Sequence, residues 1–203
     1  HVRSRRQRQM CIRDRPYTIQ NYLADQITVP RFSTELPEFA EAEKAVQARI
    51  DHLMGIKGKK SVDSIHKELG HIMWEYVGMG RTEEGLKTAL KLLKDIRKEF
   101  ETNLFIPGST EGVNIELEKA LRLNDFITMG ELIAYDALNR NESCGGHFRE
   151  EYQTEEGEAK RDDENYFYVS CWEYQGSDDV APVLYKEPLV YEAIKVQTRN
   201  YKS

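Results

Sequence analysis

The sequence predicts a mainly α protein, in which an antiparallel bundle of three to four helices is followed by a small irregular α+β tail domain with a few short strands. Three observations support this. Apolar residues recur every three or four positions between residues 37 and 141, which is the spacing of an amphipathic helix. Glycine- and proline-containing turns interrupt that periodicity, and short turns join antiparallel neighbours in a bundle. After residue 141, acidic runs, glycines and alternating aromatic residues replace the helical spacing.

The composition is that of a polar chain that still has enough large side chains to form a core. Of 203 residues, 39% are hydrophobic and 32% are charged, with 11 Tyr, 7 Phe and 2 Trp. No apolar run reaches the ~20 residues that a membrane-spanning helix needs. Three scattered cysteines do not make a disulfide framework. We therefore expect a soluble protein of a reducing compartment.

The first fifteen residues differ in charge from the rest. Residues 1–15 hold six Arg against one Asp, a net of +5, and because the whole chain carries -6, the remaining 188 residues carry -11. Such a basic arm is able to tether nucleic acid or an anionic lipid surface. The stretch RQRQMCIRDR also resembles translated sequencing-adapter read-through, and we interpret residues 1–15 as a non-native addition. With the body at -11, we expect no nucleic-acid partner.

The next segment leads into the bundle. Residues 16–36 are interpreted as a remnant and linker, in which residues 17–27 form a short helix that ends before Pro30. Pro37 suits the first turn of the following helix, where its missing N–H would be unpaired in any case. We expect this helix to reach about Leu53, and the bundle domain to cover residues 37–141.

Three further helices are predicted, over residues 61–76, 82–103 and 114–139. Ser61 and Thr82 are of the residue types that cap helix N-termini. Val62, Ile65 and Leu69 begin a 3,4-spaced apolar stripe that needs a partner surface. The second of these helices carries lysines at helical spacing, which we interpret as a solvated face: Lys87, Lys91, Lys94 and Lys98.

The tail domain is assigned to residues 142–203. It holds seven Lys or Arg against fourteen Asp or Glu, a net of -7. Residues 166–174 alternate aromatic and β-branched side chains and are predicted to form a strand, and residues 183–185 and 191–196 are candidates for further short strands. A tail of this size has little core of its own, so we expect it to pack on the bundle or on another domain.

One pair of residues has metal-ligand spacing. Glu68 and His71 stand at i and i+3 on a predicted helix, as in the ExxH unit of di-iron four-helix bundles. Such a centre needs a second ExxH, and the five histidines provide none. We favour an exposed or capping pair, with a di-iron bundle as the alternative.

A denser charged cluster follows the bundle. His147–Glu151 (HFREE) and Arg161–Glu164 (RDDE) combine imidazole, guanidinium and carboxylate groups in a short stretch. Arginine binds carboxylates bidentately, so this cluster fits a buried ion-pair network or a clamp for a substrate carboxylate. We favour the network. Cys144 lies near His147, but no third group that would orient a nucleophile is evident, and the chain has neither a GxGxxG after a strand nor a P-loop.

The same two stretches resemble a known signature. Residues 141–150 (NESCGGHFRE) and 161–165 (RDDEN) are similar to the ESRGAHxRxD … RDDENW pattern in the C-terminal region of succinate dehydrogenase and fumarate reductase flavoprotein subunits. The likeness extends over residues 16–203 and includes Tyr201. Cys144 and Gly146 replace the commoner Arg and Ala, in a form similar to the branch from Bacteroidetes-like bacteria.

The resemblance implies a parent oxidoreductase that interconverts succinate and fumarate through a histidine-linked FAD. It also implies electron transfer to an iron–sulfur subunit and then to membrane quinone, with a membrane cytochrome b subunit as an indirect partner on the cytoplasmic side of the bacterial inner membrane. The family's flavin-binding and catalytic residues all precede this region. The chain is therefore expected to be a C-terminal fragment that binds no FAD and no metal, is soluble, and has no activity by itself.

For the charged cluster, the resemblance implies structural or interface roles that tie the tail to the bundle and to the flavin-binding domain. The residues concerned are His147, Arg149, Glu150, Arg161, Asp162 and Asp163. No catalytic residue is expected. The alternative hypothesis is a stand-alone helical interaction module, an adaptor with a basic N-terminal arm.

Overall fold

The computed structural model of the chain describes residues 18–29, 32–176, 180–193 and 195–197. The basic arm of residues 1–15 and Tyr201 lie outside the described residues. Contacts divide the chain into two units, one up to Arg49 and one from Ile50 onwards.

The first unit contains α2, Gln20–Thr28, and most of α3, Pro37–Gly55. These helices confirm the two that the sequence predicts before residue 55. Their apolar side chains are not covered within the unit: Tyr22, Leu23 and Ile27 on α2 are exposed, as are Phe39 and Val46 on α3. No side chain caps the start of α2, and the exposed apolar residues of both helices are not packed within this unit.

The second unit is built on three long helices, α4 (Val62–Val77), α5 (Glu83–Asn103) and α6 (Ile115–Asn139). Each begins at a side-chain cap. The side-chain oxygens of Ser61, Thr82 and Asn114 accept hydrogen bonds from main-chain N–H groups three residues ahead, at 3.2, 3.0 and 3.1 Å. These caps satisfy N–H groups that have no partner within the helix, so the three starts are fixed locally and fall within a residue of those predicted.

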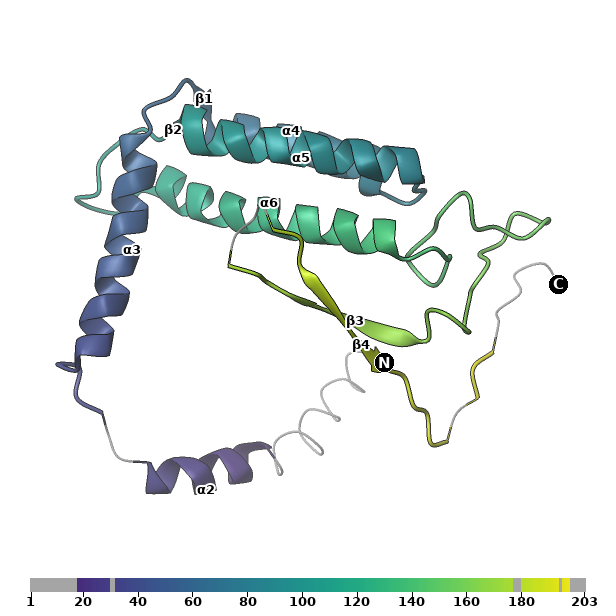
Figure 1. Cartoon of the computed structure of the whole chain (residues 1–203). Helices are drawn as coiled ribbons and strands as arrows, with labels where there is room; N and C mark the ends of the chain where they lie inside the picture. The colour runs from purple at the N-terminus through teal and green to yellow at the C-terminus, as the bar shows by residue number, and fades with distance from the viewer. Residues whose placement is uncertain (1–17, 30–31, 177–179, 194, 198–203) are drawn as a thin grey trace, which may run out of the picture. The chain divides into compact units, whose positions relative to one another are not determined.

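The three helices pack against one another and bury a single apolar core (Figure 1). α4 and α6 run in the same direction, because His66 stacks on Phe126 and Met73 lies beside Gly130. α5 returns between them, as expected for short connections. The core includes Ile65, Leu69, Leu86, Leu93, Phe100, Leu123 and Ile127. The last turn of α3 adds Leu53, so the predicted bundle of three to four helices is confirmed.

A two-residue parallel ladder that the sequence does not predict closes one end of this bundle. β1, Lys60–Ser61, pairs with β2, Leu104–Phe105. The main chains approach so closely that a Cβ added to Gly58 would overlap the main chain of Asn103, and the Gly58 N–H donates to the Leu104 carbonyl at 2.7 Å. This position therefore needs glycine for space.

The tail contributes an antiparallel hairpin of β3, Tyr168–Glu173, and β4, Val183–Pro188. Alternate β3 side chains face the bundle, and the Trp172 Nε1–H donates to Asp136 of α6 at 2.8 Å. The strands predicted within residues 166–174 and from residue 183 are confirmed. Residues 191–196 form no strand at their described positions, because no partner strand lies beside them. Across the described part of the chain, no helix combines the length and apolarity that crossing a membrane requires.

Candidate functional site

The tail meets the bundle where α4 ends, α5 begins and α6 ends. The Arg81 N–H donates to the Phe148 carbonyl at 3.0 Å, and the Glu150 N–H donates to the Arg81 carbonyl at 2.8 Å. These bonds hold the tail segment alongside the turn between α4 and α5. Four side chains then reach from this pairing to the helix ends, and we call them the clasp: Arg81, His147, Arg149 and Glu151.

Arg149 caps the C-terminus of α6. Its side chain is fully buried, and Nη1 donates to the carbonyls of Ala137 and Leu138 at 3.0 and 3.3 Å. Carbonyls of a last turn have no partner within the helix, and a cation there also meets the negative end of the helix dipole. α6 has no basic residue in its own last turn. Arg149 therefore supplies from the tail the charge that the helix lacks.

The Arg149 main chain is held as firmly as its side chain. Ser143, which is fully buried, accepts a hydrogen bond from the Arg149 N–H at 2.8 Å and donates to the Arg149 carbonyl at 3.1 Å. The guanidinium also lies over the Tyr152 ring, 5.4 Å from its centroid. These contacts fix both the position and the orientation of Arg149.

Glu151 extends the link to α5. It accepts from Arg149 Nε at 3.1 Å and from the main-chain N–H of Glu83, the first residue of α5. Burial alone would raise the pKa of Glu151, but the hydrogen bonds from Glu83, from its own main chain and from Arg149 hold that pKa below its usual value. A carboxylate is favoured at a helix N-terminus. One ion pair therefore joins the start of α5 to the end of α6.

Arg81 caps the C-terminus of α4, as Arg149 caps that of α6. Its Nε donates to the carbonyls of Val77 and Gly78, both at 3.1 Å, and α4 has no basic residue in its last turn. Burial lowers the pKa of Arg81, and the nearby charge of Asp136 opposes that effect. Nη1 lies 2.9 Å from Nδ1 of His147.

His147 is held in its neutral form by its two neighbours. A guanidinium only donates, so Nδ1 must accept from Arg81. The Arg140 carbonyl, 2.9 Å from Nε2, only accepts, so Nε2 must carry the proton. Burial lowers the pKa of His147, and the charges of Arg81, Arg149 and Arg140 lower it further against the effect of the Arg140 carbonyl. Both ring nitrogens are engaged, which leaves neither free to act as a base toward Cys144.

A second ion pair, between Arg140 and Glu142, lies next to the clasp. Arg140 Nη1 lies 3.1 Å from Glu142, which is only 3% exposed, and Arg140 Nη2 donates to the Tyr168 carbonyl at 2.8 Å. The other Glu142 oxygen accepts from the Asp162 N–H at 2.9 Å. Glu142 thus links α6, β3 and the RDDEN segment.

The predicted site residues separate into two groups. His147 and Arg149 are in the clasp, and Glu150 joins it through its main chain. Arg161 and Asp163 form an ion pair with each other. Asp162 accepts from Asn165 and is joined to the first group through Glu142 alone.

Sequence reasoning did not single out Arg81, Arg140, Glu142 or Glu151. Arg81 follows the glycines that end a helix with no basic residue in its last turn. That combination is a signal for an external cap, although the sequence does not show which helix end receives it.

A pocket of about 550 Å³ opens beside the clasp, between α6 and the hairpin. Arg81, Arg140 and His147 line it together with apolar side chains that include Leu132 and Ile133. Each arginine of this region has a carboxylate near it: Glu151 for Arg149, Glu142 for Arg140 and Asp136 for Arg81. Each of these three arginines therefore has a carboxylate of the same chain near it, while Arg149 Nη2 is buried without a hydrogen-bond partner among the described residues.

The ExxH pair lies on α4, where His71 is exposed. Glu68 binds Lys60 at 2.9 Å, and within the described ranges no three His, Cys, Asp or Glu side chains are grouped as metal ligands would be.

Comparisons with known proteins agree with this architecture. Residues 66–201 match the family model described as fumarate reductase flavoprotein C-term. The fumarate reductase flavoprotein subunit of Proteus vulgaris is 29% identical over 148 residues, which is 71% of this chain and 24% of that protein. An uncharacterized FAD-dependent oxidoreductase of Methanocaldococcus jannaschii is 31% identical over 112 residues, 55% of this chain and 20% of that protein.

Solved structures share the fold. A quinol-fumarate reductase with menaquinol molecules superposes with a TM-score of 0.68 at 22% identity, covering 83% of this chain and 28% of that one. Mycobacterium smegmatis Sdh1 in complex with UQ1 gives 0.66 at 24% identity, covering 82% and 27%. The chain thus spans about a quarter or less of the length of the curated relatives that it matches. Because the family model covers most of the sequence, the chain belongs to the family of the fumarate reductase flavoprotein C-terminal domain.

Proposed function

We propose that this chain is the C-terminal bundle and tail of a succinate dehydrogenase or fumarate reductase flavoprotein subunit, and that its own role is structural. The complete subunit interconverts succinate and fumarate and passes electrons through FAD to an iron–sulfur subunit and to quinone. The observation that carries the structural role is the clasp: Glu151 and Arg149 of the tail bind the start of α5 and the end of α6, and His147 of the tail contacts Arg81, which caps the end of α4. Catalysis requires groups free to meet a substrate. Arg81, His147 and Arg149 bind groups of the chain itself, and Arg149 Nη2, which has no partner among the described residues, is buried.

The organisation proposed with this function keeps the boundaries predicted from the sequence. Residues 1–15 are a non-native addition, residues 16–36 leave the flavin-binding domain, residues 37–141 form the bundle and residues 142–203 form the tail. The clasp supports treating bundle and tail as one folding unit, because Arg149 and Arg81 each join elements of both.

FAD, which the family implies, does not fit the described residues. Binding a dinucleotide pyrophosphate takes a strand, a glycine-rich turn and a helix N-terminus in sequence. Of the described strands, β1 runs directly into α4, and β2 reaches α6 through a loop whose glycines, Gly108 and Gly112, do not have the G-x-G-x-x-G spacing. We propose that FAD is held by the part of the subunit that precedes this chain, and that the iron–sulfur subunit, a membrane cytochrome b subunit and a place at the cytoplasmic side of the inner membrane belong to the assembled complex.

Absorbance tests this proposal directly. The purified 203-residue chain, incubated with FAD and desalted, is expected to show no flavin bands and no succinate oxidation with an artificial electron acceptor. The complete subunit from the same source is expected to show both. A flavin retained by the 203-residue chain would contradict the proposal, and so would a reading frame in which translation starts close to residue 1, which favours the adaptor.

A further inference from the structure

An exposed apolar face lies on the opposite side of the bundle from the lysines. On α4, His66, Gly70 and Trp74 follow one another at four-residue spacing, which aligns them along one side of the helix. On α6, Phe126, Met129 and Ile133 lie at three- and four-residue spacing, which also places them along one side of the helix. The stacked rings of His66 and Phe126, with centroids 5.4 Å apart, join the two rows. We call this the α4–α6 face.

The side chains of this face are large and open to solvent. Trp74 is 83% exposed, Met129 52%, and Phe126 and Ile133 are more than two-fifths exposed. Between them, Gly70 has nothing within 4 Å of the position that a Cβ would take, so the surface is notched there. An exposed tryptophan surrounded by apolar side chains is typical of a protein interface, where Trp is among the residues that contribute most to binding.

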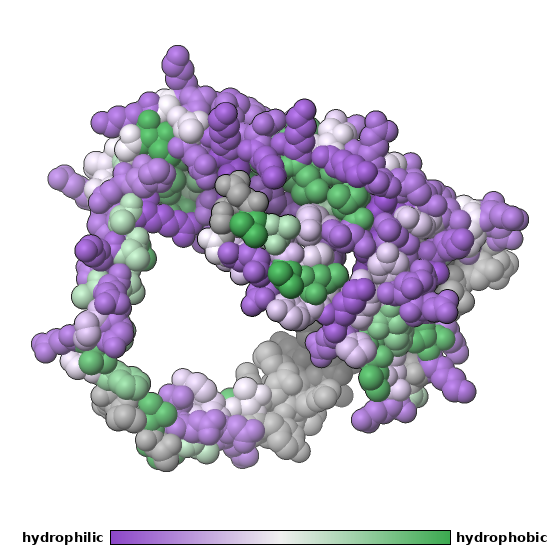
Figure 2. Space-filling view, viewed as in Figure 1, coloured by the Kyte–Doolittle hydropathy of each residue, from purple (hydrophilic) through white to green (hydrophobic). Residues whose placement is uncertain are grey.

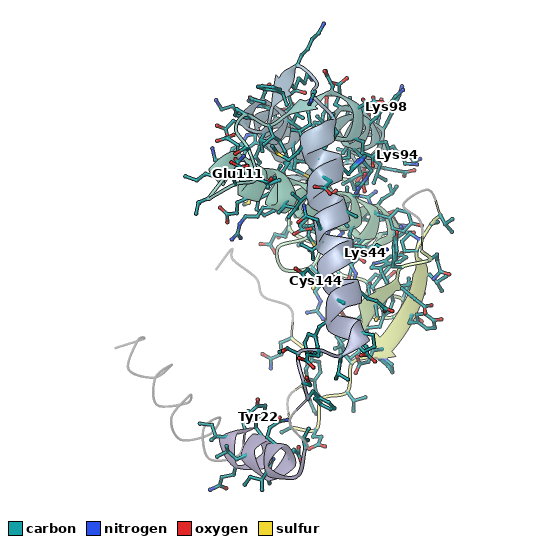
Figure 3. All side chains as sticks on the ribbon, turned by 90° about the vertical axis from the view of Figure 1, so that its left-hand side faces the viewer. Tyr22, Lys44, Lys94, Lys98, Glu111 and Cys144 are labelled. Carbon is teal, nitrogen blue, oxygen red and sulfur yellow. The ribbon has the colours of Figure 1, made fainter. Side chains whose placement is uncertain are left out.

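The outer face of α5 shows that this apolar exposure is not general. Lys87, Lys91, Lys94 and Lys98 are exposed there. Lys94 and Lys98 point away from the bundle in Figure 3, and the surface over α5 is mostly hydrophilic in Figure 2. The outer face of α5 is thus polar, whereas the α4–α6 face is apolar.

The α4–α6 face also has the polar border expected of an interface. Ile133 belongs both to this face and to the lining of the pocket beside the clasp, where Arg81, Arg140 and Asp136 are found. A hydrophobic centre bordered by polar groups is the usual anatomy of a protein–protein contact.

We infer that the α4–α6 face is the surface on which the preceding, flavin-binding part of the same subunit packs, with Trp74 as its most exposed side chain. This inference rests on the proposed function. The chain covers about a quarter or less of its curated relatives, and the family model that it matches is that of a C-terminal part. On the proposed function, a body several times larger belongs to the same polypeptide. Because it is covalently attached, its effective concentration favours it over any separate partner.

Trp74→Glu tests the inference in two settings. Trp74 is largely exposed, so the substitution is expected to leave the far-UV circular dichroism and the unfolding midpoint of the 203-residue chain unchanged. In the complete subunit the same charge would be buried, and the yield of flavin-loaded protein is expected to fall several-fold. Val113→Glu is the matched control, since Val113 is 98% exposed in the loop before α6 and lies outside the face.

Acrylamide quenching adds a measurement that does not depend on yield. The fluorescence difference between each protein and its Trp74→Phe variant isolates Trp74. Its quenching constant is expected to be several-fold lower in the complete subunit than in the 203-residue chain. Equal quenching in a flavin-loaded subunit that tolerates Trp74→Glu would overturn the inference and leave the proposed function standing.

The remaining outcomes are equally decisive. If the complete polypeptide binds no flavin, the proposed function fails and the inference fails with it. If Trp74→Glu converts a dimer of the complete subunit to a monomer with its flavin content unchanged, a second copy covers the face. If Trp74 becomes protected only when the iron–sulfur subunit is added, that partner covers it. Either result overturns the assignment to the flavin-binding part.

Discussion

The two halves of the charged signature, His147–Glu151 and Arg161–Asn165, have similar side chains and very different surroundings. Arg149 is fully buried and bonded to helix carbonyls, a carboxylate and a serine. Arg161 pairs with an exposed carboxylate on Asp163, two residues away. The amino-acid composition therefore indicates where charged residues cluster. How much each residue stabilises the fold depends on whether its side chain reaches a helix end.

Arg149→Ala is expected to give the largest loss of stability. It leaves the Ala137 and Leu138 carbonyls without their donor and removes one partner of Glu151, which still accepts from the Glu83 N–H. Each buried polar group that is left unpaired costs about 1–3 kcal/mol. Urea unfolding of the 203-residue chain measures the change. In the complete subunit, the same variant is expected to lower assembly, while whatever assembles with flavin retains turnover.

Arg122→Ala is the matched control for Arg149→Ala, because Arg122 is an arginine on α6 whose pair with Glu118 is exposed. Its expected cost is about 0–1 kcal/mol. Equal losses in the two variants would contradict the assignment of Arg149 as a helix cap. An assembled, flavin-loaded Arg149→Ala subunit without turnover would show instead that Arg149 is catalytic.

Ser143→Ala is expected to come next. The Ser143 hydroxyl accepts from the buried Arg149 N–H and donates to the Arg149 carbonyl. Its removal leaves that N–H without its partner, whereas the carbonyl still accepts from the Tyr152 N–H at 2.8 Å. An unsatisfied buried group costs about 1–3 kcal/mol. Ser109→Ala, in the exposed loop before α6, is expected to change the unfolding free energy little. A Ser143→Ala variant as stable as the parent would show that water replaces the hydroxyl.

His147 is expected to make the first half of the signature sensitive to mild acid, and the second half contains no histidine. Burial, followed by the charges of the neighbouring arginines, lowers the pKa of His147 below its usual value. The unfolded chain therefore binds a proton first as the pH falls. The stability that neutral His147 contributes is complete above about pH 6.5 and is lost progressively as the pH falls from there through the lower pKa of the folded state.

Urea unfolding from pH 7.5 to 5.5 measures this effect. The parent chain is expected to lose more stability over this interval than His147→Gln, which does not titrate. His71→Gln, at an exposed position on α4, is the control and should follow the parent. If His147→Gln loses as much as the parent, the hydrogen bonds that fix the neutral ring do not persist in solution.

Helices were predictable from the sequence because their determinants are local. Ser61 and Thr82 cap helices a few residues away, and the apolar stripes repeat within one turn. The β1–β2 ladder was not predictable, because each strand has only two residues and the paired residues Lys60 and Leu104 are 44 positions apart in the sequence. The role of Arg81 was hidden for the same reason: His147 is 66 residues away, and only the folded bundle brings α4, α5 and α6 to one end. For the tail, the resemblance indicated which residues belong together, and the structure shows what each one binds.

Arg161→Ala is expected to cause the smallest loss of stability among these variants. The hydrogen bonds to Asp163 raise the pKa of Arg161, the guanidinium also donates to the Gln197 carbonyl at 3.1 Å, and Asp163 is about half exposed. Exposed pairs contribute about 0–1 kcal/mol and are screened by salt. Unfolding of Arg161→Ala and Asp163→Ala in low and high salt is expected to stay within that range, with the smaller change at high salt. If Arg161→Ala lost as much stability as Arg149→Ala, the hydrogen bond from Arg161 to the Gln197 carbonyl, rather than the ion pair with Asp163, would hold the tail in place. Asp163→Ala distinguishes the two contacts, because it removes the ion pair and keeps the hydrogen bond to Gln197.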